Sequence, residues 1–225
     1  MSADTASSHG GQPQILRKQD WAYLRIRDGI LTGEYPQGGR LDEVKLAEEM
    51  NLSRVPVRDA LSRLASEGLV IDTPHKRRIV AQMSLQDAED IYAGRVSLEV
   101  TLGRAACQRA TAEDHDRVRR VLTEQRGVET DHLQEARRLD REFHSAMYAA
   151  AGLPRTLAAL GQLRVLSERY IHLYMASPDR RRASLADHEE LLAAFQHGDP
   201  DTLAALVEKH VMEGIGALRP ILAAS

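Results

Sequence analysis

Four residues in the second half of the chain have side chains and spacing suited to metal binding. Asp140 and His144 are four positions apart, so on a helix they share one face. His188 precedes the turn at Gly198 by about 10 residues and His210 follows it by about 12, which places them level in an antiparallel helical hairpin. Three imidazoles and one carboxylate suit a divalent ion such as Zn, Ni or Mn, with coordination positions left for water or a ligand.

Each of these side chains also has a simpler interpretation. His188 is equally suited to a surface position, and Asp140 can pair with Arg137 or Arg141. Histidines on helices are common and metal sites are rare, so spacing alone leaves the cluster a hypothesis. The single cysteine, Cys107, excludes an intramolecular disulfide and a cysteine-rich metal site.

A second group of residues is basic and suits nucleic-acid binding. Arg54 and Arg58 lie opposite the apolar stripe of a helix predicted between Ser53 and Gly68, where their guanidinium groups fit the major groove of DNA. A predicted turn at 73–77 adds His75, Lys76 and Arg77, with Arg78 directly after it. The alternative is a solvated face with local ion pairs. We favour DNA binding because the charges occur on both the helix and the hairpin turn.

The elements that carry these residues follow from apolar spacing and turn signals. The N-terminal part is predicted to contain a helix from about 16 to 32, a helix capped by Asp42, a helix capped by Ser53, and strands at 69–72 and 78–83. This order is typical of a winged helix-turn-helix. A capping box at 84–87 then starts a series of long helices, predicted at about 84–109, 112–126, 131–151, 154–176, 181–197 and 199–222.

The predicted fold class is therefore mainly α, with an N-terminal winged helix-turn-helix that includes a small β-hairpin and a C-terminal all-α helical bundle. A length of 225 residues accommodates two domains, which we place at 15–82 and 84–225 after a disordered tail at 1–14. The net charge of −3 argues against general polyanion binding but allows a local basic patch. Neither a leader nor a spanning segment is apparent, which predicts a cytoplasmic protein without a membrane partner.

The region 31–70, LTGEYPQGGRLDEVKLAEEMNLSRVPVRDALSRLASEGLV, resembles the DNA-binding domain of GntR-type bacterial transcription regulators. The resemblance implies that Arg54 and Arg58 contact DNA from the recognition helix. Further contacts are then expected from Lys45, Ser53, His75, Lys76 and Arg77. This sequence departs from the family pattern at Val55, where Thr is usual, and at Arg77, where Gly is usual.

Later segments resemble the effector domain, called FCD, of the FadR-like subgroup of that family. They are YAGRVSLE at 92–99, LDREFHSAMYAAAG at 139–152, ADHEELLAAFQHGD at 186–199, and a late histidine. The resemblance implies that Asp140, His144, His188 and His210 bind a metal and that a small carboxylate binds against it. It also implies that Arg95 pairs with this acid; the alternative is an ordinary ion pair with Glu99, four positions on.

These features predict a transcriptional regulator rather than an enzyme. We expect a homodimer that binds double-stranded operator DNA, because one recognition helix reads too few bases for a unique site. A small organic acid at the metal site would modulate this binding, and the protein would lie in the bacterial cytoplasm, at the nucleoid when bound to DNA. Two alternatives remain: a regulator for which the divalent ion is itself the signal, and an all-α metalloenzyme whose ion activates water.

Overall fold

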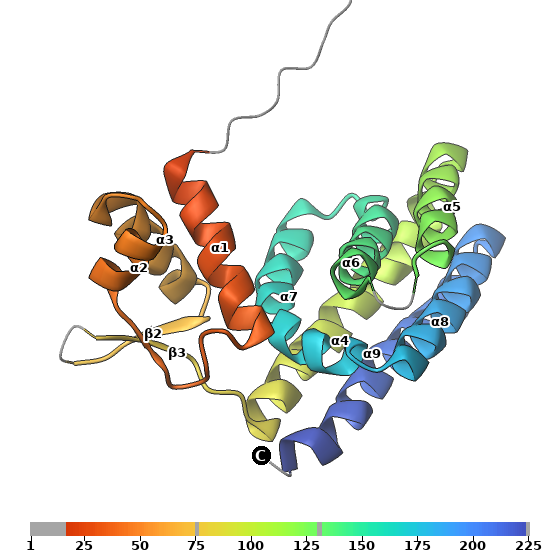
Figure 1. The fold of residues 1–225 in the computed structure, drawn as a ribbon. Coiled ribbons are helices and arrows are strands. Elements are labelled where there is room, and N and C mark those ends of the chain that lie inside the picture. Colours follow the sequence, from red (N-terminus) through yellow and green to blue (C-terminus); the bar gives the residue numbers. More distant parts are fainter. Residues whose placement is uncertain (1–16, 75–76, 130–131, 224–225) are drawn as a thin grey trace, which may run out of the picture.

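A computed structural model describes residues 17–74, 77–129 and 132–223. The tail predicted at 1–14 lies outside these residues. The N-terminal part comprises α1 (Lys18–Thr32), β1 (Arg40–Leu41), α2 (Glu43–Glu49), α3 (Arg54–Ser66), β2 (Val70–Asp72) and β3 (Arg78–Val80). The remainder comprises α4 (Leu85–Arg109), α5 (Ala112–Arg126), α6 (Leu133–Ala149), α7 (Pro154–Met175), α8 (Pro178–His197) and α9 (Pro200–Ala223). A winged helix-turn-helix beside an all-α bundle confirms the predicted fold class (Figure 1).

The N-terminal part is organised around α3, which packs against α1 and α2. Its buried stripe recurs with helical spacing and consists of Val57, Ala60, Leu61 and Leu64. Asp42 caps α2 as predicted, because its carboxylate accepts the backbone N–H groups of Val44 at 2.9 Å and Lys45 at 3.3 Å. Leu41 and Leu46 belong to the same core, so the start of α2 is fixed from both sides.

The sheet has three strands in the order β1-β3-β2, all antiparallel. Strand β1 was not predicted, because two residues carry no readable alternation and exist as a strand only through pairing with β3. The second predicted strand, 78–83, is shorter than expected and ends at Val80. Beyond it, the carbonyls of Ala81 and Gln82 accept hydrogen bonds from Arg169 of α7 rather than from another strand.

Two predicted helix caps differ in the structure. Ser53 occupies the N-cap position of α3, but its side chain makes no capping hydrogen bond. Ser84 accepts the N–H of Asp87 at 3.1 Å, yet the reciprocal half of the predicted capping box is replaced by Tyr170. The Tyr170 hydroxyl donates to the Asp87 carboxylate at 2.6 Å and accepts the Ser84 N–H at 3.2 Å. The start of α4 is therefore fastened to α7.

The helical bundle is built on α4, which packs along α9 on one side and α7 on the other. A second, larger core fills the end formed by α4, α5, α6, α8 and α9, with Leu102, Phe143, Leu191, Phe195 and Val207 among its buried residues. Helix α8 begins at Pro178, earlier than the predicted 181. No helix in the described chain is long and apolar enough to cross a membrane.

Three consecutive residues of α7 join the two parts of the molecule. Glu168, Arg169 and Tyr170 are 4%, 5% and 0% exposed. Glu168 forms an ion pair with Arg27 of α1, Arg169 donates to the carbonyl of Ala81, and Tyr170 holds the start of α4. The position of the winged part relative to the bundle therefore depends on where this segment of α7 lies.

Candidate metal centre and nucleic-acid interface

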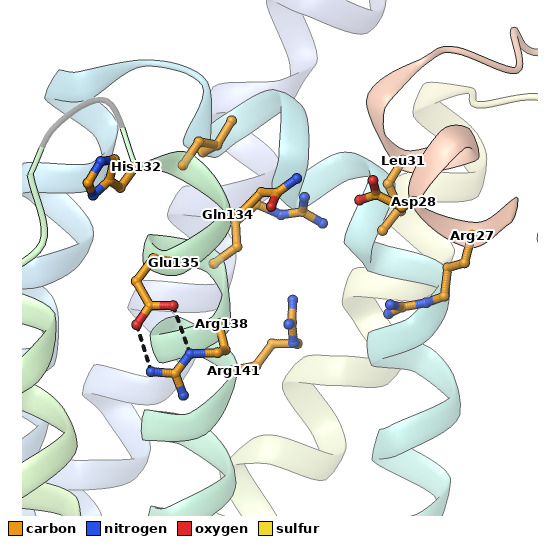
Figure 2. Close-up of a pocket in the computed structure, with 10 residues that line it drawn as sticks. Arg27, Asp28, Leu31, His132, Gln134, Glu135, Arg138 and Arg141 are labelled. Carbon is orange, nitrogen blue, oxygen red and sulfur yellow. Dashed lines mark hydrogen bonds and ion pairs between the residues drawn. The ribbon is translucent and has the colours of Figure 1, made fainter. Parts of the chain in front are cut away.

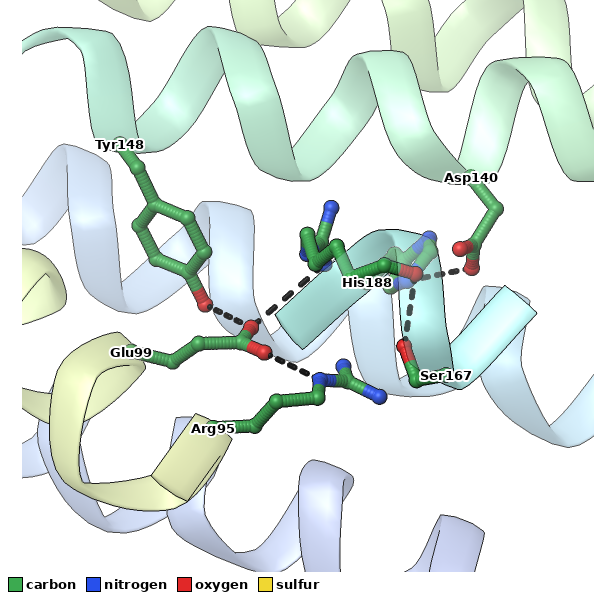
Figure 3. Close-up of polar contacts among 7 residues, drawn as sticks. Arg95, Glu99, Asp140, Tyr148, Ser167 and His188 are labelled. Atoms are coloured by element: carbon green, nitrogen blue, oxygen red, sulfur yellow. Dashed lines mark hydrogen bonds and ion pairs between the residues drawn. The ribbon is translucent and has the colours of Figure 1, made fainter. Parts of the chain in front are cut away.

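The four residues predicted as metal ligands come from three helices and meet inside the bundle. Asp140 and His144 extend from α6, His188 from α8 and His210 from α9. One nitrogen from each imidazole lies within 4.8 Å of the other two. The His188 Nε2 atom is 3.6 Å from Asp140 Oδ1, the contact drawn in Figure 3. The structure thus brings together a carboxylate and three imidazoles separated by as many as 70 positions.

Two imidazole nitrogens of this cluster are buried without a hydrogen-bond partner among the described residues. They are His144 Nδ1 and His188 Nε2, on side chains that are 1% and 0% exposed. A buried polar atom without a partner is rare, because burial removes its hydrogen bonds to water and no protein hydrogen bond replaces them. A divalent ion bonded to the nitrogen lone pairs would satisfy them, so the residues present fit a metal.

Two further residues orient the histidines. His188 Nδ1 lies 2.9 Å from the amide oxygen of Gln125 on α5, and His210 Nδ1 lies 2.9 Å from the Asp187 carboxylate. Because these oxygens accept hydrogen bonds, each Nδ1 carries the proton and each Nε2 keeps a free lone pair. Such outer partners fix the tautomer that binds metal. The sequence did not point to them, since each contact depends on how two helices pack.

Burial keeps two of the histidines neutral. It holds the pKa of His144 well below its usual value, assisted by the positive charge of Arg164 and by the neighbouring imidazoles. Burial likewise lowers the pKa of His188, with further contributions from His210 and Arg164. Neutral imidazole is the form that coordinates a metal. Protons therefore compete little with an ion for these two side chains at neutral pH.

A cavity of about 30 Å³ adjoins the cluster. Asp140, His144 and His210 line one side of it, and Tyr174 and Met175 of α7 line another. A space of this size accommodates about one or two water molecules. An organic acid of several carbons fits only if the wall moves.

Arg95 of α4 also lines this cavity, while its Nε donates to Glu99 at 2.8 Å (Figure 3). The pair anticipated from the sequence is therefore present, but in the interior rather than at the surface: Arg95 is 4% exposed and Glu99 0%. Glu99 also accepts the Tyr148 hydroxyl at 2.9 Å. Although burial alone would raise the pKa of Glu99, the charges of Arg95 and Arg164 hold it below its usual value. An ionised carboxylate thus accompanies Arg95 at neutral pH.

The residues predicted to contact DNA are exposed on α2, on α3 and at the hairpin. Arg54 and Arg77 line one open hollow of about 580 Å³, so the start of α3 and the described side of the hairpin turn face a common space. Arg54 pairs with Glu43 at 3.3 Å. Arg58, Lys45 and Ser53 are also exposed, whereas His75 and Lys76 lie outside the described residues.

Arg78 directly follows the basic turn, and its guanidinium group forms hydrogen bonds within the winged part. Its Nε donates to Asp72 at 3.0 Å, Nη1 to the carbonyl of Arg58 at 3.2 Å and Nη2 to Ser62 at 2.8 Å. These bonds fix the hairpin against α3. Asp140 likewise has neither of the arginine partners considered for it, since Arg141 pairs with Glu168 at 3.8 Å.

Comparisons with known proteins agree with this arrangement. Residues 18–78 match the family model described as "Bacterial regulatory proteins, gntR family", and residues 90–213 match the FCD domain. The Nta operon transcriptional regulator of Aminobacter aminovorans is 31% identical over 185 residues, covering 82% of this chain and 87% of that protein. The HTH-type transcriptional repressor RspR of Escherichia coli (strain K12) is 24% identical and covers 88% of each chain.

Among solved structures, E. coli McbR/YncC superposes with a TM-score of 0.77 at 23% identity, covering 92% of this chain and 99% of that one. This likeness shows a shared fold. The family consists of transcriptional regulators and not of enzymes, which decides against the metalloenzyme alternative. The chain therefore belongs to the GntR family and is a DNA-binding transcriptional regulator with an FCD domain.

Proposed function

We propose that this regulator holds one divalent ion, with Zn, Ni and Mn as candidates, and that a small organic acid bound against the ion modulates operator binding. Asp140, His144, His188 and His210 would hold the metal. The observation that carries the proposal is the pair of buried imidazole nitrogens that lack a hydrogen-bond partner in the described part of the chain. The ion would supply open coordination positions for a carboxylate oxygen, and Arg95 would supply a counter-charge.

A route from this site to the DNA-binding part follows from α7. The cavity of about 30 Å³ admits an acid of several carbons only if residues such as Tyr174 and Met175 move. The same helix carries Glu168 and Arg169, whose bonds to Arg27 and Ala81 hold the winged part. Packed helices move as units, so a shift at one end of α7 also displaces this segment. In this proposal residues 15–82 bind DNA and residues 84–225 bind the effector and dimerise.

The proposed operator-binding species is a homodimer. Two recognition helices related by two-fold symmetry reach half-sites about one turn of DNA apart, near 34 Å, and this multiplies the sequence that is read. We expect the interface to lie mainly in the helical part. Sedimentation at micromolar concentration tests this, and a monomer both with and without DNA would contradict it.

A second candidate function is favoured by the size of the cavity. A space of about 30 Å³ beside the ligands suits a hydrated metal without any acid, which is expected if the ion is itself the signal. Operator affinity measured with metal alone and with metal plus organic acids separates the two functions. An effect of the ion that no acid alters would favour the second.

Metal analysis of protein purified without chelators tests the site. We expect about one equivalent of metal per chain, lost in His188→Ala and in His210→Ala but retained in His197→Ala, whose exposed side chain lies at the end of α8. Wild-type protein that neither contains nor takes up Zn, Ni or Mn would remove the metal proposal. Metal affinity that survives both ligand substitutions would show that the ligand assignment is wrong.

A further inference from the structure

An open hollow of about 680 Å³ lies between α1 of the winged part and the N-terminal half of α6. Figure 2 shows Arg27 and Asp28 on α1 across from Gln134 and Arg141 on α6. None of the residues lining this hollow lines the cavity at the metal cluster. It is therefore a separate space, with one wall from each part of the molecule.

Positive charge dominates the lining of the hollow, where four arginines meet two acids. Arg138 is neutralised, because it pairs with Glu135 at 2.7 Å and with Glu142 at 2.5 Å. Arg27 and Arg141 share a single carboxylate, that of Glu168. Local pairing thus leaves the remaining guanidinium groups short of negative charge.

Arg137 is the least compensated of these cations. It is 5% exposed, and its only described hydrogen-bond contact is between Nη1 and His172 Nδ1 at 3.0 Å. Among the described residues, its Nε is buried without a partner and no carboxylate forms an ion pair with it. Burial lowers the pKa of Arg137, and the charges of Arg141 and Arg27 add to this effect, while the charges of Glu168 and Asp28 oppose it. A buried cation in this state is stabilised by an added anion.

The first turn of α6 contributes a further anion-binding element. Leu133, Gln134 and Glu135 of this turn line the hollow. The first N–H groups of a helix have no acceptor within the helix, and they carry the positive end of its dipole. Helix starts next to arginine side chains are frequent binding places for oxyanions.

We propose that this hollow binds a small oxyanion, a phosphate or carboxylate group, with Arg137 and Arg141 as its principal charged contacts. Arg27 contributes from the opposite wall. Because the two walls belong to different parts of the molecule, a bound anion links α1 to α6 across the hollow. The site shares no lining residue with the metal centre, so it is tested separately from the function proposed above.

Calorimetric titration of the full chain tests the proposal, with inorganic phosphate, glycerol 3-phosphate and succinate as probes at constant ionic strength. We expect saturable binding of at least one probe, weakened about tenfold or more in Arg137→Gln and about threefold or more in Arg141→Gln. Arg120→Gln, at an exposed position of α5, is the matched control and is expected to change the affinity by less than about twofold.

The arms of the experiment identify the source of the anion and its location. Binding of both phosphate probes supports a phosphorylated ligand, and binding of succinate alone supports a carboxylate. Binding must persist in His188→Ala and in Arg54→Ala. This result excludes the metal centre and the DNA-binding face as the place where the probe binds. If Arg137→Gln fails to fold, Arg141→Gln alone decides. The proposal is overturned if no probe binds saturably, if Arg141→Gln or a folded Arg137→Gln binds as the wild type does, or if His188→Ala or Arg54→Ala abolishes binding.

Discussion

Replacement of Gln125 by Leu removes an oriented hydrogen bond without touching any metal ligand. Gln125 is 9% exposed, and its amide oxygen lies 2.9 Å from His188 Nδ1. Leu has a similar size but offers no acceptor. His188 then loses the partner that keeps its proton on Nδ1 and its lone pair on Nε2.

The expected loss of metal affinity is about 10- to 100-fold, the usual effect of removing an outer-shell partner of a histidine ligand. This corresponds to about 1.4 to 2.8 kcal/mol. Competition with a chromophoric indicator at pH 7.5 measures the affinity. Gln125→Glu keeps an acceptor at the same place and is expected to bind metal at least as tightly as the wild type.

Gln162→Leu, at an exposed position of α7, is the matched control and is expected to leave metal affinity unchanged. A folded Gln125→Leu protein whose affinity lies within about twofold of the wild type would refute the orienting role of this hydrogen bond. The same result would weaken the assignment of His188 as a ligand through Nε2.

Three further predictions concern DNA binding, coupling and pH. Arg54→Ala and Arg58→Ala are each expected to cost about 1 to 3 kcal/mol on the operator and less on random DNA, measured by fluorescence anisotropy; unchanged operator affinity in both would contradict a recognition role for α3. Glu168→Gln removes the carboxylate charge that pairs with Arg27 of α1 and Arg141 of α6. We therefore expect the organic acid to change operator affinity less in this variant, while metal affinity stays unchanged. An undiminished effect of the acid would exclude coupling through α7. In metal-free protein, the pKa values of His144 and His188 lie below the usual histidine value. Below about pH 6.5 the unfolded chain therefore binds more protons than the folded protein. The free energy of unfolding should consequently fall as the pH decreases through that value. Urea denaturation from pH 8 to 5 measures this, and a variant with Gln at both positions that keeps the wild-type slope would show that other groups are responsible.

Most helices could be predicted because their ends carry local signals. Asp42, Gly33 and Gly198 fix helix ends through their own side chains or backbone angles, so a single sequence is sufficient to place them. Strand β1 could not be predicted, since it depends on β3, some 40 positions away. The same limit applies to the hydrogen bonds of Arg78, whose partners on α3 lie 20 and 16 positions away in the sequence.

The placement of the candidate ligands followed from helical geometry. Asp140 and His144 are one turn apart, and the Gly198 turn sets His188 level with His210. Their outer partners were missed because nothing in the sequence indicates that α5 lies beside α8 at Gln125. The ion pair between Arg27 and Glu168 was hidden for the same reason, with 141 positions between its members.

The most direct test of the proposed regulation is a titration of operator DNA with the full chain in metal-loaded and metal-stripped forms, each with and without a small organic acid. We expect the acid to change the operator Kd of the metal-loaded wild-type protein only. Stripped protein and His188→Ala should not respond to the acid. An equal response in stripped protein, or none in protein shown to be fully loaded and tested against a broad set of small carboxylates, would contradict it.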